Sequence, residues 1–195
     1  WVYQRLANAL RTAVEDCRNV RAEPVFSFVG SLSAAGLAEE IRRLGSEADA
    51  LAVVSVDHPA VSAAIAECTA RGLPVYALLS PLRAPDIAGY VGIDGFAAGR
   101  TAGWAMARIA PSRGEIGILL GSHRYLGQEA NERGFRSAML DYQPGRVIRD
   151  TIVYLDDETV AYGAAQELLD RSSGLVGIYH SGGGVGGVAR ALEES

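Results

Sequence analysis

Residues 89–100 read GYVGIDGFAAGR and join a short strand to a helix. Tyr90, Val91 and Ile93 form the strand pattern, Asp94 follows it, and an alanine- and glycine-rich helical segment begins at once. In open α/β sheets, ligands bind where the carboxyl ends of strands meet helix N-termini. We therefore expect Asp94 to lie at a binding site, either as an acceptor for a ligand or as the N-cap of the following helix.

Strand and helix patterns alternate on both sides of this stretch. The strands are short apolar runs with little polar alternation, which predicts parallel sheets covered by helices on both faces. Apolar residues spaced three or four apart predict an opening helix over residues 1–19. The sequence predicts further strands over residues 25–29, 50–56, 74–79, 90–93, 115–120, 147–154 and 175–179, and further helices over 34–44, 59–71, 96–109, 129–140, 157–169 and 185–194.

The two series of strand–helix units meet near residue 93. We expect an N-terminal lobe over residues 1–92 and a C-terminal lobe over residues 93–195, each a doubly wound parallel sheet in the α/β class. A single large doubly wound sheet would give much the same pattern.

Composition and charge limit the classes of function. The 195 residues carry a formal net charge of −5, so we expect no nucleic-acid binding by this chain itself. No apolar stretch has the length of a membrane span, and we expect no membrane partner. Cys17 and Cys68 fall in helical patterns beside apolar residues, which is typical of buried free thiols in a reducing compartment. We therefore expect a cytoplasmic protein.

Enzymatic chemistry finds little support in the sequence. Residues 180–187 (HSGGGVGG) look like a phosphate cradle, but neither the acid of a dinucleotide fingerprint nor the lysine of a P-loop follows. The serine-containing turns do not match the Gly-x-Ser-x-Gly pattern of a hydrolase. The three histidines are spread over three strand ends, without the spacing of metal ligands. We expect no enzyme, no cofactor and no metal site, and we expect Asp57 and Asp156 to be helix caps.

Several motifs together resemble the effector-binding core of LacI-type transcriptional repressors, a core that is similar to the periplasmic sugar-binding proteins of type I. Their order and spacing carry the resemblance, which covers almost the whole chain. The motifs are PVYALLS at 74–80, YVGID at 90–94, AGRTAG at 98–103, GILLG at 117–121, GFRSA at 134–138 and IYHSGGG at 178–184.

The resemblance implies two lobes that close on a small effector, often a sugar. It also implies a homodimer of cores and a DNA-binding headpiece upstream, to which nothing in this chain corresponds. The family's first strand and its last strands have no counterpart here either, so we expect type I periplasmic-binding-protein lobes that are incomplete at both ends.

The resemblance also suggests the ligand contacts. Asn131 and His180 stand where the family usually has arginine and asparagine, so we expect a weaker charged grip and pH-dependent binding. A polar cluster suited to hydroxyl groups, or else a solvated loop and helix start, is formed by Arg124, Tyr125, Gln128, Glu129 and Asn131. An alternative function is a solute-binding protein that serves a sugar transporter. The expected ligand-binding residues are Ser31, Ser80, Asp94, Tyr125, Asn131 and His180.

Overall fold

The computed structural model describes residues 2–18, 21–30 and 33–195. These fall into two units, residues 1–32 and residues 33–195, and each is described by itself. The first unit contains helix α1 (Val2–Asp16), three residues shorter than the predicted helix at its carboxyl end.

The predicted strand over residues 25–29 is wrong. Residues 21–30 have no regular secondary structure, and the side chains of Val25 and Phe28 are 75% and 57% exposed. A strand exists only through ladder hydrogen bonds to a neighbour. Among the described residues, the first strand, β1, pairs with β2 alone. Residues 25–29 therefore have no ladder partner in sheet A, and their apolar composition alone does not make them a strand.

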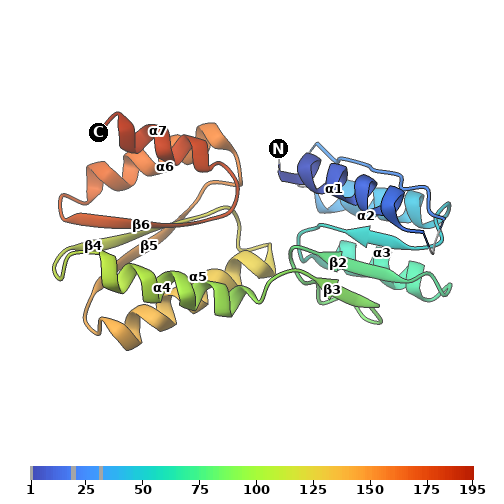
Figure 1. The fold of residues 1–195 in the computed structure, drawn as a ribbon, viewed down its shortest axis with the longest axis horizontal. Coiled ribbons are helices and arrows are strands. Elements are labelled where there is room, and N and C mark those ends of the chain that lie inside the picture. Colours follow the sequence, from blue (N-terminus) through green and yellow to red (C-terminus); the bar gives the residue numbers. More distant parts are fainter. Residues whose placement is uncertain (1, 19–20, 31–32) are drawn as a thin grey trace. The chain divides into compact units, whose positions relative to one another are not determined.

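The second unit alternates strands and helices along its whole length (Figure 1). All the remaining predicted elements are present, with shifts of a few residues at their ends. They are α2 (Ala34–Gly45), β1 (Leu51–Val53), α3 (Pro59–Thr69), β2 (Val75–Leu78), β3 (Gly89–Val91), α4 (Gly95–Ile109), β4 (Glu115–Leu120), α5 (Leu126–Tyr142), β5 (Val147–Val153), α6 (Glu158–Arg171), β6 (Leu175–Ser181) and α7 (Val185–Glu193).

The strands form two separate parallel sheets, which we name sheet A and sheet B. Sheet A has the order β1-β2-β3 and sheet B the order β5-β4-β6. Sheet A packs one face against α2 and α3, and this core contains Ile41, Ile65, Cys68 and Val75. The division into lobes at residues 92/93 stays a prediction, although the chain passes from one sheet to the other between Val91 and Glu115.

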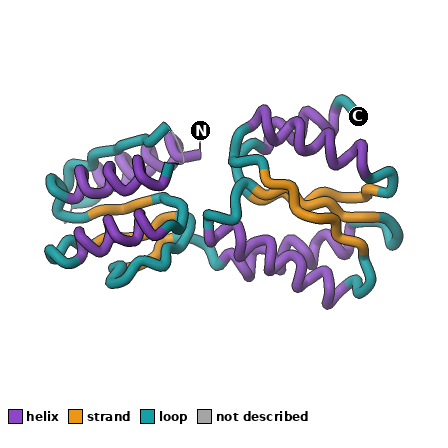
Figure 2. The backbone as a smooth tube through the Cα atoms, turned by 180° about the vertical axis from the view of Figure 1, so that it is seen from behind, coloured by secondary structure: helices purple, strands orange, loops and turns teal. Residues whose placement is uncertain are grey.

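Sheet B is covered on both faces. One face, with Ile116 and Ile118, packs against Phe135 and Met139 of α5, and the other, with Leu119, packs against α6 and α7. Figures 1 and 2 show the pair α4/α5 on one side of the three strands and the pair α6/α7 on the other. The predicted α/β fold with parallel sheets of the type I periplasmic-binding-protein kind is confirmed.

Helices α4 and α5 approach each other through their backbones. A Cβ added at Gly99 would lie 1.9 Å from the carbonyl oxygen of Asn131, and one added at Gly134 would lie 2.0 Å from that of Phe96. Both distances are impossible for a real side chain, so these positions require glycine. The close approach fixes the start of α4 against the start of α5.

The cysteine prediction holds for one residue of the two. Cys68 is buried in the core of sheet A, whereas Cys17 is exposed, and both are free thiols. Cys17 is the residue that follows the end of α1. Among the described helices, none has both the length and the apolar character that crossing a membrane requires.

Candidate functional site

The carboxyl ends of the strands carry most of the predicted ligand residues. Ser31 lies outside the described residues. Ser80, directly after β2, is 5% exposed, and its Oγ accepts a hydrogen bond of 3.1 Å from the backbone N–H of Gly127 in the first turn of α5. Ser80 therefore joins the edge of sheet A to the beginning of α5.

Asp57, after β1, also stabilises this edge, and it is not the helix cap we expected. Its Oδ1 accepts from the backbone N–H of Arg83, and its own N–H donates to the carbonyl of Arg124 at 2.7 Å. The cap of α3 is instead the neighbouring His58, whose Nδ1 accepts from the N–H of Ala60. The imidazole thus caps α3, while the Asp57 carboxylate has its partner across the loop.

Asp94 is the N-cap of α4. Its Oδ1 accepts from the backbone N–H of Ala97 at 3.0 Å, which confirms one of the two predicted roles. The residue is exposed, and the second role, contact with a ligand, stays a prediction.

Tyr125 and Asn131 belong to packed structure and not to a solvated loop. Tyr125 precedes α5 in the N-cap position and is 7% exposed. Asn131 Nδ2 donates to Ser181 Oγ at 3.0 Å, while its buried Oδ1 has no hydrogen-bond partner within the described residues. A Cβ at Gly95 would lie 2.9 Å from that Oδ1, so the amide is held against the start of α4.

Asp156 is the centre of a polar network at the edge of sheet B. The cap of α6 is Asp157, so the prediction that Asp156 caps this helix is wrong. Asp156 has a left-handed backbone (φ 60°), and its Oδ1 accepts from the N–H of Gly183 at 2.6 Å. Gln128 Nε2 donates to both carboxylate oxygens, at 3.3 and 3.1 Å, and Gln128 Oε1 accepts from the N–H of Ser122. The strained turn thus places a carboxylate between the ends of β4 and β6.

His180 joins the same network through the other side of the Gly183 peptide. Its Nε2 lies 2.9 Å from the Gly183 carbonyl oxygen and 2.6 Å from the hydroxyl of Tyr154, which itself donates to that carbonyl at 2.7 Å. Burial lowers the pKa of His180, against the opposing effects of the Gly183 carbonyl and the Asp156 charge. Burial, aided by Asp156, raises the pKa of the Tyr154 hydroxyl. Burial therefore favours the neutral form of His180.

A second buried carboxylate, Glu132, lies on α5. It accepts from Arg136 Nε at 2.8 Å and from Thr151 Oγ1, and it faces His123 at 2.9 Å. Burial opposes the charge, but these hydrogen bonds outweigh it and lower the pKa of Glu132. Thr151 belongs to β5, and Arg136 bonds to Thr151 as well, so Glu132 ties α5 to β5 and serves the packing of this helix.

The structure separates the predicted residues into two places. Ser80, Asp94, Tyr125 and Asn131 surround the N-termini of α4 and α5. His180 lies on the other face of sheet B, where Tyr154 packs against α6 and α7.

Sequence reasoning missed two members of the network: Tyr154, which it did not consider, and Asp156, which it expected only as a helix cap. The signal for them lies in the glycines: a Cβ at Gly121 would lie 2.0 Å from Asp156 Oδ1, and one at Gly182 would lie 2.5 Å from it. Glycines at the ends of two neighbouring strands indicate that a side chain from elsewhere, here Asp156, occupies the space that their own side chains would need.

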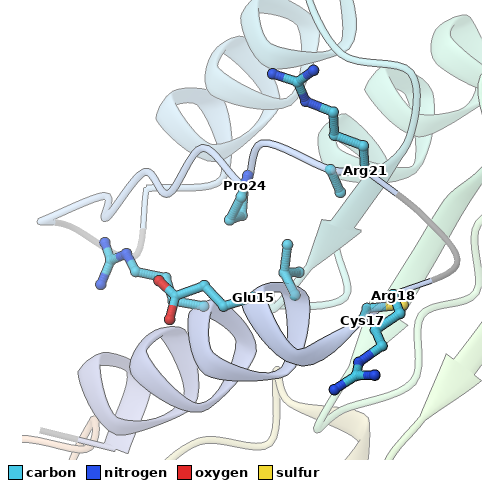
Figure 3. A pocket seen from close by; sticks show the side chains of 8 residues that line it. Glu15, Cys17, Arg18, Arg21 and Pro24 are labelled. Carbon is cyan, nitrogen blue, oxygen red and sulfur yellow. The ribbon is translucent and has the colours of Figure 1, made fainter.

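The first unit contains a hollow with none of the predicted residues in it. Its volume is about 580 Å³, and it lies between the end of α1 and the segment that follows. Figure 3 shows the guanidinium groups of Arg18 and Arg21 pointing away from each other, so they do not converge on one anion. Across residues 2–18, 21–30 and 33–195, no three histidine, cysteine or carboxylate side chains gather as a metal ion would require.

Comparison with known proteins assigns the chain to a family. The family model described as "Periplasmic binding protein domain" matches residues 28–195. The chain belongs to this family. One relative is the xylitol-binding protein of Mycolicibacterium smegmatis. It is 31% identical over 113 residues, which are 57% of this chain and 32% of the relative. The aligned stretch thus spans about a third of that relative's length.

Solved structures share the fold of this periplasmic binding protein domain. An ABC transporter solute-binding protein from Agrobacterium vitis with bound D-fucose has a TM-score of 0.85 at 18% identity, over 97% of this chain and 67% of that one. The fructose-binding periplasmic domain of a hybrid two-component system also has a TM-score of 0.85 at 18% identity, over 100% of this chain and 64% of that one. All three proteins are binding proteins or binding domains: for xylitol, for fructose, and for a solute, with D-fucose bound in the structure.

Proposed function

We propose that this periplasmic binding protein domain binds a small polar molecule, a sugar or sugar derivative, at the carboxyl ends of the strands of residues 33–195. The observation that carries the proposal is the polar network in which Gln128 and the Gly183 peptide orient Asp156 and His180 at the edge of sheet B. Relatives named for xylitol, fructose and D-fucose support the choice of a carbohydrate. In this proposal the ligand lies between the two sheets and draws hydrogen bonds from both of their edges.

A titration of the protein with a panel of sugars and alditols tests this proposal. Xylitol, D-xylose, D-fucose, D-fructose, D-galactose and L-arabinose represent the chemistry of the relatives and of their common isomers. We expect at least one of them to bind with a dissociation constant in the micromolar range or below, measured by isothermal titration calorimetry. A panel in which nothing binds and nothing shifts the melting temperature would refute the proposal.

We further propose that binding serves gene regulation, with the chain as the effector-sensing core of a LacI-type regulator. Such a protein works in the cytoplasm as a homodimer and contacts DNA only through a headpiece outside this chain. The motif pattern from Tyr90 to Gly184 supports this role. A ligand shifts such a protein only through its different affinity for two states.

The alternative role is a solute-binding protein of a sugar transporter, which the likeness to the Agrobacterium vitis protein supports equally well. A gel shift with the full-length protein and the DNA upstream of its gene separates the two roles. The regulator predicts a retarded band whose intensity changes with the bound sugar, while the transporter protein predicts none. The isolated chain, with its net charge of −5, is the negative control.

A further inference from the structure

The outer face of the helix pair α4/α5 carries arginines and exposed aromatic rings in a row. One side of α4 presents, at intervals of four residues, Phe96, Arg100, Trp104 and Arg108. Phe96 and Trp104 are 38% and 44% exposed. Figures 1 and 2 show this helix pair on one side of sheet B, with α6 and α7 on the other. We name this row, together with its partners on α5, the α4/α5 ridge.

Each end of the α4/α5 ridge holds a guanidinium group against an aromatic ring. At one end, the guanidinium of Arg133 lies 5.9 Å from the centre of the Phe96 ring. At the other end, the guanidinium of Arg108 lies 4.3 Å from the ring of Trp104 and 5.4 Å from that of Tyr142, and it spends one donor on the Trp104 carbonyl. Among the described residues, neither arginine has a carboxylate within ion-pair distance. Both ends therefore keep an oriented but unpaired positive charge.

The middle of the α4/α5 ridge is neutral and rigid. Arg100 donates to Ser137 Oγ at 2.9 Å and to Asp141 Oδ2 at 2.8 Å, so its charge has a partner. Beneath it the two helices meet through their backbones, because a Cβ added at Gly99 would lie 1.9 Å from the carbonyl oxygen of Asn131. A surface that is already fixed costs a partner little entropy to order.

The composition of the α4/α5 ridge is typical of a surface that binds another protein. Tryptophan, tyrosine and arginine are the residue types that contribute most to the energy of protein interfaces. A row of side chains at intervals of four is also the ridge that packs into the groove of a neighbouring helix. Since the whole chain has a net charge of −5, unpaired arginines at both ends of one row favour an acidic partner here.

The spacing of the two unpaired charges defines that partner further. Phe96, which Arg133 covers, and Arg108 are about 18 Å apart along α4, at about 1.5 Å per residue. Three turns of a second helix span about 16 Å, so two carboxylates on one helical face reach both arginines. The side chains between these carboxylates then meet Trp104, which requires them to be apolar.

We infer that the α4/α5 ridge binds an acidic amphipathic helix of another protein, with carboxylates three turns apart and apolar side chains between them. A single-stranded nucleic acid also stacks on aromatic rings, but two unpaired arginines on a chain of net charge −5 neutralise few phosphates. The inference goes beyond the proposed function and does not depend on sugar binding.

Two synthetic peptides test the inference on the whole chain. Both are alanine-rich helices with leucines on one face. The acidic peptide has glutamates three turns apart on that face, and its control has glutamines in their place. We expect the acidic peptide to bind with a dissociation constant of about 100 µM or below, at least tenfold more tightly than the control, and more weakly as salt is added. Fluorescence anisotropy of the labelled peptides measures this binding.

Variants of the protein locate the peptide. Arg108→Gln and Arg133→Gln should each weaken the acidic peptide about two- to fivefold, and Trp104→Ala should weaken it about tenfold or more. Arg190→Gln is the matched control, because Arg190 also lies 4.3 Å from an aromatic ring, that of Tyr162, but belongs to α7. The control variant should bind the acidic peptide as the wild type does.

Three results would overturn the inference. The first is equal binding of the two peptides, or no binding of either. The second is a loss in Arg190→Gln as large as in Arg108→Gln, which would mean that the acidic peptide has no preference for the α4/α5 ridge. The third is a different occupant of the ridge: a homodimer that Trp104→Ala abolishes in sedimentation equilibrium, or a single-stranded oligonucleotide that displaces the peptide.

Discussion

The two sheets of residues 33–195 are covered by helix pairs that pack in different ways. On sheet A, α2 and α3 meet through side chains, with the thiol of Cys68 3.8 Å from the carbonyl of Ile41. On sheet B, α4 and α5 meet through backbone atoms at Gly99 and Gly134. Side chains can adjust to a change by moving, but backbones in contact cannot. The beginnings of α4 and α5 are therefore the more rigidly placed part of the molecule.

The polar groups at the two sheet edges also differ in how fully their atoms are used by contacts within the protein. At sheet A, Ser80 and Asp57 are bound to backbone N–H groups, so their polar atoms serve the fold. At sheet B, Asp156 and His180 are oriented by Gly183, and Asp156 Oδ2 has Gln128 as its one hydrogen-bond partner within the described residues. In the proposed function, the edge of sheet A therefore contributes mainly structure and the edge of sheet B mainly contacts with the ligand.

The largest expected effect follows from the backbone contact of α4 and α5. Gly99→Val should reduce the free energy of unfolding by about 3 kcal/mol, because its side chain would need the space of the Asn131 carbonyl. Denaturation with urea, followed by circular dichroism, measures the change.

Gly163→Ala in α6 is the control for this substitution. A Cβ there meets nothing within 4 Å, so the variant should be more stable by about 1 kcal/mol through helix propensity alone. Similar free energies of unfolding for the two variants would show that the contact between α4 and α5 can adjust to an added side chain, as a contact made through side chains can.

An intermediate effect separates the two sheet edges. Ser80→Ala leaves the Gly127 N–H without its acceptor, and Asn131→Ala leaves Ser181 Oγ without its donor. Each should cost about 1 kcal/mol of stability. Asn131→Ala should also weaken the binding of the best neutral sugar about tenfold. Ser80→Ala should weaken binding less, because the Ser80 oxygen already accepts a hydrogen bond from the Gly127 N–H.

The exposed Ser173, replaced by alanine, is the control for both variants and should leave stability and affinity unchanged. Equal losses of sugar affinity in Ser80→Ala and Asn131→Ala would contradict the division of roles between the edges. They would favour instead a ligand gripped equally from both sheets.

Much of this fold could be predicted from the sequence, because parallel strands and their helices follow local apolar patterns. The pattern over residues 115–120 predicts β4 to the residue, since a central strand buried on both faces is apolar throughout. Residues 25–29 have a similar composition and form no strand. The difference depends on which backbone lies alongside, and local pattern contains no information about that.

The candidate site was less predictable for the same reason. Asp94 follows from its place before a helix, because N-capping is a local interaction. Asp156 does not, because its partners Gln128 and Gly183 are 28 and 27 residues away in the chain. Asp157 beside it looked the same in sequence and became the cap. Only the fold distinguishes the two carboxylates.

The smallest expected effect is a pH dependence that belongs to the edge of sheet B. Burial lowers the pKa of His180 below its ordinary value of 6.5, with Tyr154 and Asp156 as the titratable neighbours. The unfolded chain then takes up a proton before the folded protein does, so stability is full above pH 6.5 and falls as the pH drops through the lowered pKa. Sugar affinity should change over the same interval, because protonation gives the ring a positive charge and N–H donors on both nitrogens. The measurement is the difference between the wild type and His180→Gln, in both melting temperature and sugar affinity, from pH 8 to pH 5. An identical pH profile for the two proteins would mean that the His180 imidazole takes no part in sugar binding and that its burial does not affect stability in this range.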